Sequence, residues 1–331
     1  IKDQGDLSLA LYAVFLPLLS LVFITGLLPW SVAGWFFLLL VLEHLTQELS
    51  RLLIAISEQL LASIMLFFRS GIWAIIVTAL MFIDTDTREL NYVLGGWAFG
   101  SFSALALGIY RLKQLKISGW HKKTDWLWIG RGLKIAIPLL IATLALRGLF
   151  TIDRYWFADL ASLDTLGAYV LFMGISSALL SFLDAGVFAF IYPGLISAHH
   201  DKDAEAFRRK LKALLWQTLI LSIAFSIVAL LIINPLLVWL NKPLYLEHEY
   251  LFPWTLLVTL LYSLGMIPHY ALYAQGLDRP IIHSHIASLL IFIPATWLMS
   301  QYWPLQAVPA GLCIAFLSIL LWKCLAFIRL T

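Results

Sequence analysis

The chain consists of long apolar stretches separated by short polar connections. Nine of ten stretches are close to the length of about 20 mainly apolar residues that a helix needs to cross a bilayer, and the sixth is longer. They occupy residues 9–28, 32–51, 60–83, 92–110, 135–152, 166–196, 214–233, 251–273, 281–299 and 307–322. None shows the alternation over about ten residues that marks a barrel strand. Because backbone groups in lipid must bond within their own segment, we predict ten transmembrane helices in an all-α polytopic membrane protein.

The composition agrees with this fold class. Of the 331 residues, 62% are hydrophobic and only 12% are charged, which is more apolar than a soluble domain. The chain begins at Ile1, and its first apolar stretch lacks the basic flank and cleavage site of a signal peptide. We therefore expect a fragment whose start is missing.

Lysine and arginine residues outside the stretches or at their ends fall mainly on one side if the helices alternate in direction. That side holds Lys2, Arg51, Arg111, Lys113, Lys116, Lys122, Lys123, Arg131, Lys134, Lys202, Arg208, Arg209, Lys210, Lys212, Arg279, Lys323 and Arg329, against Arg88, Arg154 and Lys242 on the other. The positive-inside rule then places both termini in the cytoplasm. Topology and anionic lipid headgroups explain the net charge of +3, and no nucleic-acid partner is expected.

The longest predicted cytoplasmic connection, 111–134, separates four stretches from six. We predict the remainder of an N-terminal lobe at 1–112, a basic cytoplasmic linker at 113–133 and a C-terminal lobe at 134–331. Membrane transporters are often built from two similar halves. A division of four and six therefore predicts that the first two helices of the N-terminal lobe are missing.

Ionisable residues within the apolar stretches are the main candidates for function, because a charge there is costly without a cavity or a partner. Glu43 and Arg69 each lie about halfway along neighbouring stretches that run in opposite directions. We expect the two side chains to meet near the middle of the membrane. The pair is then either a structural ion pair or part of a transport cavity, with Glu43 as a candidate acid and Arg69 as a substrate contact.

Arg147 and Arg154 are seven residues apart and share a helix face, so we expect the first to be buried and the second to lie at the outer lip. Two guanidinium groups along one stripe suit an anionic diphosphate, because each offers a planar fork to phosphate oxygens. Asp153 is a further candidate acid of the cavity. Alternatively, Asp153 neutralises Arg154 and caps the helix.

Asp184 lies deep in the sixth stretch, where a carboxyl group can exchange protons as access to it alternates. It is therefore a candidate coupling acid. Two alternatives remain open: the helix shifts so that Asp184 reaches the headgroups, or Asp184 pairs with Arg147 or Lys134.

Common enzyme motifs are absent from the sequence: there is no GxSxG, HExxH, P-loop or CxxC pattern. The longest outer connection is short for a catalytic domain. We expect no enzyme activity, no metal site and no cofactor, with a proton or sodium gradient as the energy source.

Several segments together resemble a known family. Lys134-Ile-Ala-Ile-Pro138, Ile152-Asp153-Arg154-Tyr155, Leu166-Gly167-Ala168-Tyr169 and Pro193-Gly194-Leu195 resemble the seventh and eighth helices of polysaccharide flippases. Arg69-Ser70-Gly71-Ile72-Trp73 resembles their fifth helix region. These flippases are the Wzx-type O-antigen transporters of the MOP exporter superfamily, which also contains the MATE drug exporters.

The resemblance implies two lobes around a V-shaped cavity that opens alternately to each side of a bacterial inner membrane. Its substrate would be an undecaprenyl-diphosphate-linked oligosaccharide, and family cavities tend to be cationic, which Arg69 and Arg147 match. Membrane lipids and the polysaccharide polymerase and chain-length machinery would be partners. Two other functions stay open: a MATE-like drug/cation antiporter with an acidic cavity, and a membrane glycan polymerase or ligase with catalytic residues on the outer face.

Overall fold

The computed structural model describes residues 2–56, 58–115 and 123–330, and no strand occurs among them. Within these residues, ten helical segments are long and apolar enough to cross a membrane. They are Lys2–Ile24, Trp30–Ile54, Gln59–Ile83, Leu90–Gln114, Trp126–Leu160, Leu163–His200, Ala204–Leu240, Glu249–Ala274, Asp278–Ser300 and Pro304–Leu330. The predicted all-α fold with ten transmembrane helices is confirmed.

Several helices extend well beyond the apolar stretches that predict them. Helix α7 (Trp126–Leu160) has 35 residues and α10 (Ala204–Leu240) has 37. Hydropathy marks only the part of a helix that suits lipid, whereas the backbone hydrogen bonds continue through polar turns at either end. Pro138 lies inside α7 without ending it, since the turns on either side keep their own hydrogen bonds.

The chain divides into two compact units, Ile1–Gly130 and Arg131–Thr331, called here the N-terminal and C-terminal units. The boundary falls inside α7. Part of the predicted linker 113–133 lies outside the described residues, namely 116–122.

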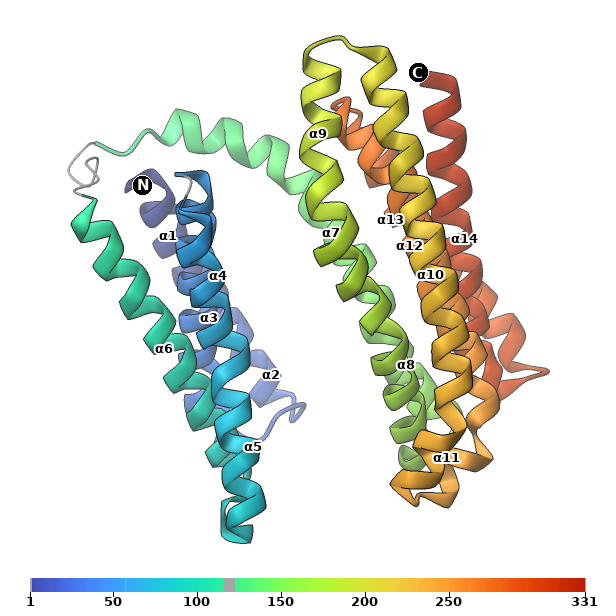
Figure 1. Cartoon of the computed structure of the whole chain (residues 1–331). Coiled ribbons are helices and arrows are strands. Elements are labelled where there is room, and N and C mark those ends of the chain that lie inside the picture. The colour runs from blue at the N-terminus through green and yellow to red at the C-terminus, as the bar shows by residue number, and fades with distance from the viewer. Residues whose placement is uncertain (1, 57, 116–122, 331) are drawn as a thin grey trace. The chain divides into compact units, whose positions relative to one another are not determined.

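In the N-terminal unit, drawn from blue to green in Figure 1, the longest helices are α3 and α6, which pack together. The α-helices are α1 (Lys2–Leu19), α2 (Leu21–Ile24), α3 (Ala33–Ala55), α4 (Gln59–Phe67), α5 (Trp73–Ile83) and α6 (Leu90–Gln114). Short 3-10 turns occupy Trp30–Val32 and Thr85–Thr87, and the π segment η2 (Phe68–Ile72) joins α4 to α5. Buried side chains of α3, α4 and α6, among them Leu53, Met65 and Ala104, form its main core cluster.

Small residues on α6 let neighbouring helices approach closely. A methyl group at Gly96, Gly100 or Gly108 would overlap side chains or backbone of the adjoining helices, whereas one at Gly95 would make only ordinary contact. Small residues have this role at many helix contacts in membranes. They place α6 directly against the π segment η2.

The C-terminal unit, drawn from green to red, has its core where α14 packs along α12 and α13 and where α8 packs against α12. Its α-helices are α7, α8 (Leu163–Leu183), α9 (Ala189–His200), α10, α11 (Pro243–Glu247), α12 (Phe252–Ala274), α13 (Asp278–Ser300) and α14 (Pro304–Leu330). A π segment η4 (Asp184–Phe188) joins α8 to α9, and a 3-10 turn η5 (Glu249–Leu251) precedes α12. Buried aromatic side chains such as Phe157, Phe172 and Phe316 fill the core.

Candidate functional site

Glu43 and Arg69 meet inside the N-terminal unit, as the sequence predicts. The Nε atom of Arg69 is 3.5 Å from Oε2 of Glu43, and the two side chains are only 16% and 22% exposed. Each residue lies near the middle of its membrane-crossing helix, Trp30–Ile54 for Glu43 and Gln59–Ile83 for Arg69. Charges at this depth need a partner or a cavity. The pair is therefore the centre of the candidate site.

Arg69 lies in the π segment η2, which interrupts its helix at that point. The indole Nε1 of Trp73 donates a 2.7 Å hydrogen bond to the carbonyl oxygen of Arg69. Gly100 of α6 packs against the same segment. A Cβ atom built on Gly100 would lie only 2.6 Å from the carbonyl oxygen of Phe68. Single π turns inside α-helices are frequent at functional sites. Here the turn is fixed by Trp73 and by close packing against α6.

The carboxylate of Glu43 is well satisfied within the protein. Its Oε1 accepts hydrogen bonds from Trp97 Nε1 at 2.8 Å and from Ser101 Oγ at 3.0 Å, while Oε2 faces the guanidinium group. The Trp97 ring also stacks on Trp73, with centroids 6.0 Å apart. Our sequence reasoning missed Trp97 and Ser101. Their spacing of four residues places both on one face of α6, and this was the available signal.

The guanidinium group of Arg69 is much less satisfied. Its buried Nε lies at ion-pair distance from Glu43 but makes no hydrogen bond. Within the described residues, neither terminal nitrogen atom of Arg69 has a hydrogen-bond partner. A guanidinium group carries five N–H donors. N–H donors of Arg69 near the middle of the helix are therefore left for an acceptor that the described residues do not supply.

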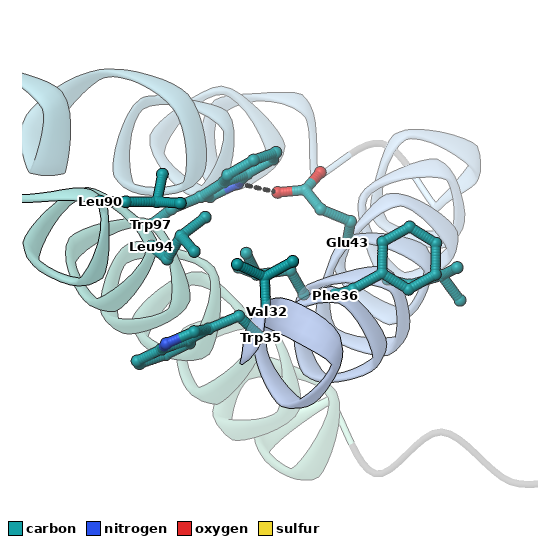
Figure 2. Close-up of a pocket in the computed structure, with 9 residues that line it drawn as sticks. Val32, Trp35, Phe36, Glu43, Leu90, Leu94 and Trp97 are labelled. Carbon is teal, nitrogen blue, oxygen red and sulfur yellow. Dashed lines mark hydrogen bonds between the residues drawn. The ribbon is translucent and has the colours of Figure 1, made fainter. Parts of the chain in front are cut away.

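A cavity of about 330 Å³ lies beside Glu43 (Figure 2). It is lined by Val32, Trp35, Phe36, Leu39, Leu40, Glu43, Leu90, Leu94 and Trp97. Glu43 is the one charged residue among them. A mainly apolar hollow with one polar group is typical of small-molecule sites, and this volume is at the lower end of their range.

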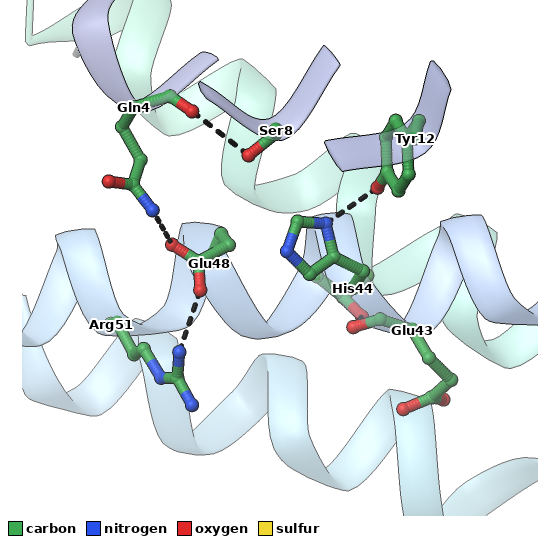
Figure 3. Close-up of polar contacts among 8 residues, drawn as sticks. Gln4, Ser8, Tyr12, Glu43, His44, Glu48 and Arg51 are labelled. Carbon is green, nitrogen blue, oxygen red and sulfur yellow. Dashed lines mark hydrogen bonds and ion pairs between the residues drawn. The ribbon is translucent and has the colours of Figure 1, made fainter. Parts of the chain in front are cut away.

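A second polar cluster joins α1 to α3 (Figure 3). Gln4 Nε2 donates to Glu48 at 2.9 Å, Arg51 pairs with Glu48 at 2.7 Å, and Tyr12 Oη lies 2.6 Å from His44 Nδ1. A cavity of about 750 Å³ is lined by apolar residues of α1, α3 and α6 together with the polar residues Lys2, Gln4, Asp6, Ser8, Tyr12, Glu48 and Arg51. The Arg51 side chain is 72% exposed, and exposed pairs of this kind add little stability.

In the C-terminal unit, Asp153 is buried in the core instead of capping a helix. Its Oδ2 accepts a 2.8 Å hydrogen bond from the Tyr169 hydroxyl, and Tyr169 stacks on Phe157 with centroids 4.4 Å apart. The other carboxylate oxygen, Oδ1, is buried without a hydrogen-bond partner among the described residues. Helix α7 continues to Leu160, so the alternative in which Asp153 and Arg154 end the helix is wrong.

Arg147 and Arg154 are both exposed within the C-terminal unit. The expectation that Arg147 is buried is therefore wrong. The buried face of α7 carries Ala145, Leu149 and Asp153 at helical spacing, and Arg147 points away from that face. Substrate contacts by the two arginine residues remain predictions.

Asp184 opens the π segment η4, much as Arg69 lies in η2. It is exposed within its unit, and in the described part of the chain it forms no ion pair with Arg147 or Lys134. Tyr262 and Tyr270 are close enough to Asp184 for electrostatic interaction. Both π segments thus carry an intramembrane charge, while a coupling role for Asp184 remains a prediction.

No protein-family model and no curated protein sequence matches the chain. Two matching crystal structures are of the MATE transporter VcmN from Vibrio cholerae. The first, of a mutant form, has a TM-score of 0.70 and 16% identity over 100% of this chain and 77% of that chain. The second, of the bent form, has a TM-score of 0.71 and 14% identity over 98% of this chain and 75% of that chain. The chain therefore has the fold of MATE transporters, as the sequence predicts.

Proposed function

We propose that this protein carries an undecaprenyl-diphosphate-linked oligosaccharide across a bacterial inner membrane by alternating access. One observation carries the proposal: Glu43 has its hydrogen bonds and its counter-ion within the chain, whereas Arg69 keeps N–H donors that no described residue accepts. A guanidinium group in this state favours an anionic ligand, and its planar fork matches phosphate oxygens.

Three further observations support the proposal. Arg147 and Arg154 share an exposed face of α7 and offer a second place for phosphate contact. The likeness in fold to a MATE transporter fits movement of a substrate across the membrane. The distribution of lysine and arginine favours cytoplasmic termini, which defines the side from which the substrate would be loaded.

The cavity beside Glu43 favours a second candidate function, the export of organic cations. Trp35, Phe36 and Trp97 line it together with the Glu43 carboxylate, and aromatic faces attract cations. Against this candidate, the Glu43 charge is already opposed by Arg69. The anionic substrate is therefore preferred.

A deletion experiment separates the two candidate functions. Deleting the gene should trap lipid-linked repeat units on the cytoplasmic face, and the complete gene should restore surface glycan. Accumulation of a fluorescent organic cation should not change. Intact surface glycan without trapped lipid, combined with increased retention of the cation, would favour the cation exporter and refute the flippase.

A further inference from the structure

Lys323 lies inside the C-terminal unit, and no described acidic residue pairs with it. Its side chain is 1% exposed, and none of the ion pairs among the described residues involves it. The sequence places this lysine just after the last apolar stretch, but α14 continues to Leu330 and its packing buries the Lys323 side chain. A buried cation inside a membrane protein is costly and is a candidate for function.

Two histidine residues surround the Lys323 amine. Its Nζ is 3.1 Å from His269 Nδ1 on α12 and 3.0 Å from His285 Nε2 on α13. The two imidazole rings are stacked with centroids 6.0 Å apart. The backbone of Ala142 on α7 also hydrogen-bonds to His285. The cluster therefore joins three packed helices and touches a fourth.

Tyrosine side chains surround the cluster. Three tyrosine residues form this surrounding layer: Tyr192 on α9, and Tyr270 and Tyr273 on α12. The Tyr270 ring centroid is 5.6 Å from that of His269. Carboxylates act on the phenols and not on the amine itself: Asp184 interacts with Tyr270, and Asp278 with Tyr192. Tyr270 therefore lies between the buried cluster and the exposed Asp184 and interacts with both.

The chemistry of the cluster suits a single exchangeable proton. An ammonium group donates to both imidazole rings only while those rings are neutral, and a second proton would place two unopposed charges side by side. One unopposed charge is itself costly to bury, although the two hydrogen bonds offset part of that cost. Because these two contributions oppose each other, the cluster can exist either with one proton bound or without it.

We propose that Lys323, His269 and His285 form a proton-binding site that takes up and releases one proton as a unit. With the proton bound, Nζ donates to both rings and ties α14 to α12 and α13. After its release, the amine and the two rings have fewer donors and the link between the helices weakens. Use of this proton to drive transport rests on the proposed function, whereas its binding does not.

Nuclear magnetic resonance of the full chain in lipid nanodiscs tests proton binding directly. The lysine Nζ and histidine ring nitrogen atoms are labelled, and the sample is titrated from about pH 5 to about pH 9. We expect the signals of Lys323, His269 and His285 to change with one common midpoint. In the K323M variant the two histidine midpoints should move by at least about one pH unit, a tenfold change in proton affinity.

Two controls and a second variant keep this test decisive. H283Q removes an exposed imidazole two residues from His285, and K242M removes an exposed amine, so neither should move the common midpoint. If K323M does not fold, H285Q, which retains polar atoms, should still change the titration of Lys323 and His269. Three independent titrations, or histidine midpoints unchanged in the variants, would overturn the proposal and show static polar packing.

A transport measurement tests the coupling separately. In proteoliposomes with the lipid-linked oligosaccharide, an imposed pH gradient should speed translocation by the unaltered chain and by H283Q, and should have less than half this effect on H285Q. Translocation that ignores the gradient in the unaltered chain would refute coupling while leaving the proposed function standing. Absence of any translocation would refute the proposed function and leave the binding result unaffected.

Discussion

Replacing Gly100 with alanine tests whether the candidate site depends on close packing between α6 and η2. An ideal Cβ at Gly100 lies 2.6 Å from the carbonyl oxygen of Phe68 and 2.6 Å from Cδ1 of Trp73. A backbone oxygen cannot rotate aside as a side chain does, so α6 or the π segment has to move. Overpacking of this kind costs about 1–3 kcal/mol. For a unit of this size, that cost lowers the melting temperature by about 3–15 °C.

The same displacement should also disturb anion binding, because Phe68 adjoins Arg69 in the π segment. The assay is thermal unfolding of the full chain in detergent, followed by binding of undecaprenyl diphosphate in nanodiscs. G95A is the matched control, since its Cβ would lie 3.7 Å from Trp35 in ordinary contact. If G100A melts and binds lipid like G95A, the packing argument for the π segment is refuted.

Three further substitutions test individual contacts. In E43Q the negative charge facing the guanidinium group is lost, and affinity for undecaprenyl diphosphate in nanodiscs should rise by up to about fivefold, or about 1 kcal/mol. In Y169F, Asp153 loses the only hydrogen bond that a described side chain donates to it. The free energy of unfolding, measured by thermal unfolding, should fall by about 1–3 kcal/mol. In G311A the new methyl group would overlap the Thr296 hydroxyl, and a similar loss of about 1–3 kcal/mol is expected by the same assay.

Each of these variants has a control within its own unit. E89Q removes an exposed carboxylate and should leave lipid affinity unchanged. Y155F removes an exposed hydroxyl, and G265A adds a methyl group at 3.8 Å from its nearest neighbour, so both should unfold like the unaltered chain. If Y169F or G311A unfolds like its control, the predicted contribution of that contact to stability is refuted. If E43Q binds the lipid more weakly than the unaltered chain, the predicted effect of the Glu43 charge is refuted.

The approach of Glu43 to Arg69 was predictable because it depends only on depth along adjacent antiparallel helices. Both residues lie near the middle of their helices, so their side chains reach the same level of the membrane. The π segment η2 was not predictable in this way, because its backbone pattern depends on Trp73 and on the contact with Gly100. The depth of a residue in the membrane follows from its position in its own apolar stretch. The distortion of a helix depends instead on contacts with other helices.

The cluster around Lys323 escaped prediction for a related reason. His269 and His285 are 54 and 38 residues away from Lys323 in sequence, and only the packing of α12, α13 and α14 brings the three together. Hydropathy placed Lys323 at the end of an apolar stretch and therefore in a loop. The burial of Arg147 was misjudged because an apolar helix gives no clear sign of which face meets the core.

Translocation of a lipid-linked oligosaccharide by purified protein tests the central claim most directly. The full chain, R69Q and R51Q are reconstituted into proteoliposomes, and the fraction of labelled undecaprenyl-diphosphate oligosaccharide exposed to an external glycosidase is followed over time. R69Q loses the charge-assisted hydrogen bond from the guanidinium group to the diphosphate, which contributes about 1.5–3 kcal/mol. Its translocation rate should therefore fall by at least about tenfold. R51Q, altered at an exposed pair, should match the unaltered chain. Equal rates for R69Q and R51Q, or no translocation by the unaltered chain, would contradict the account.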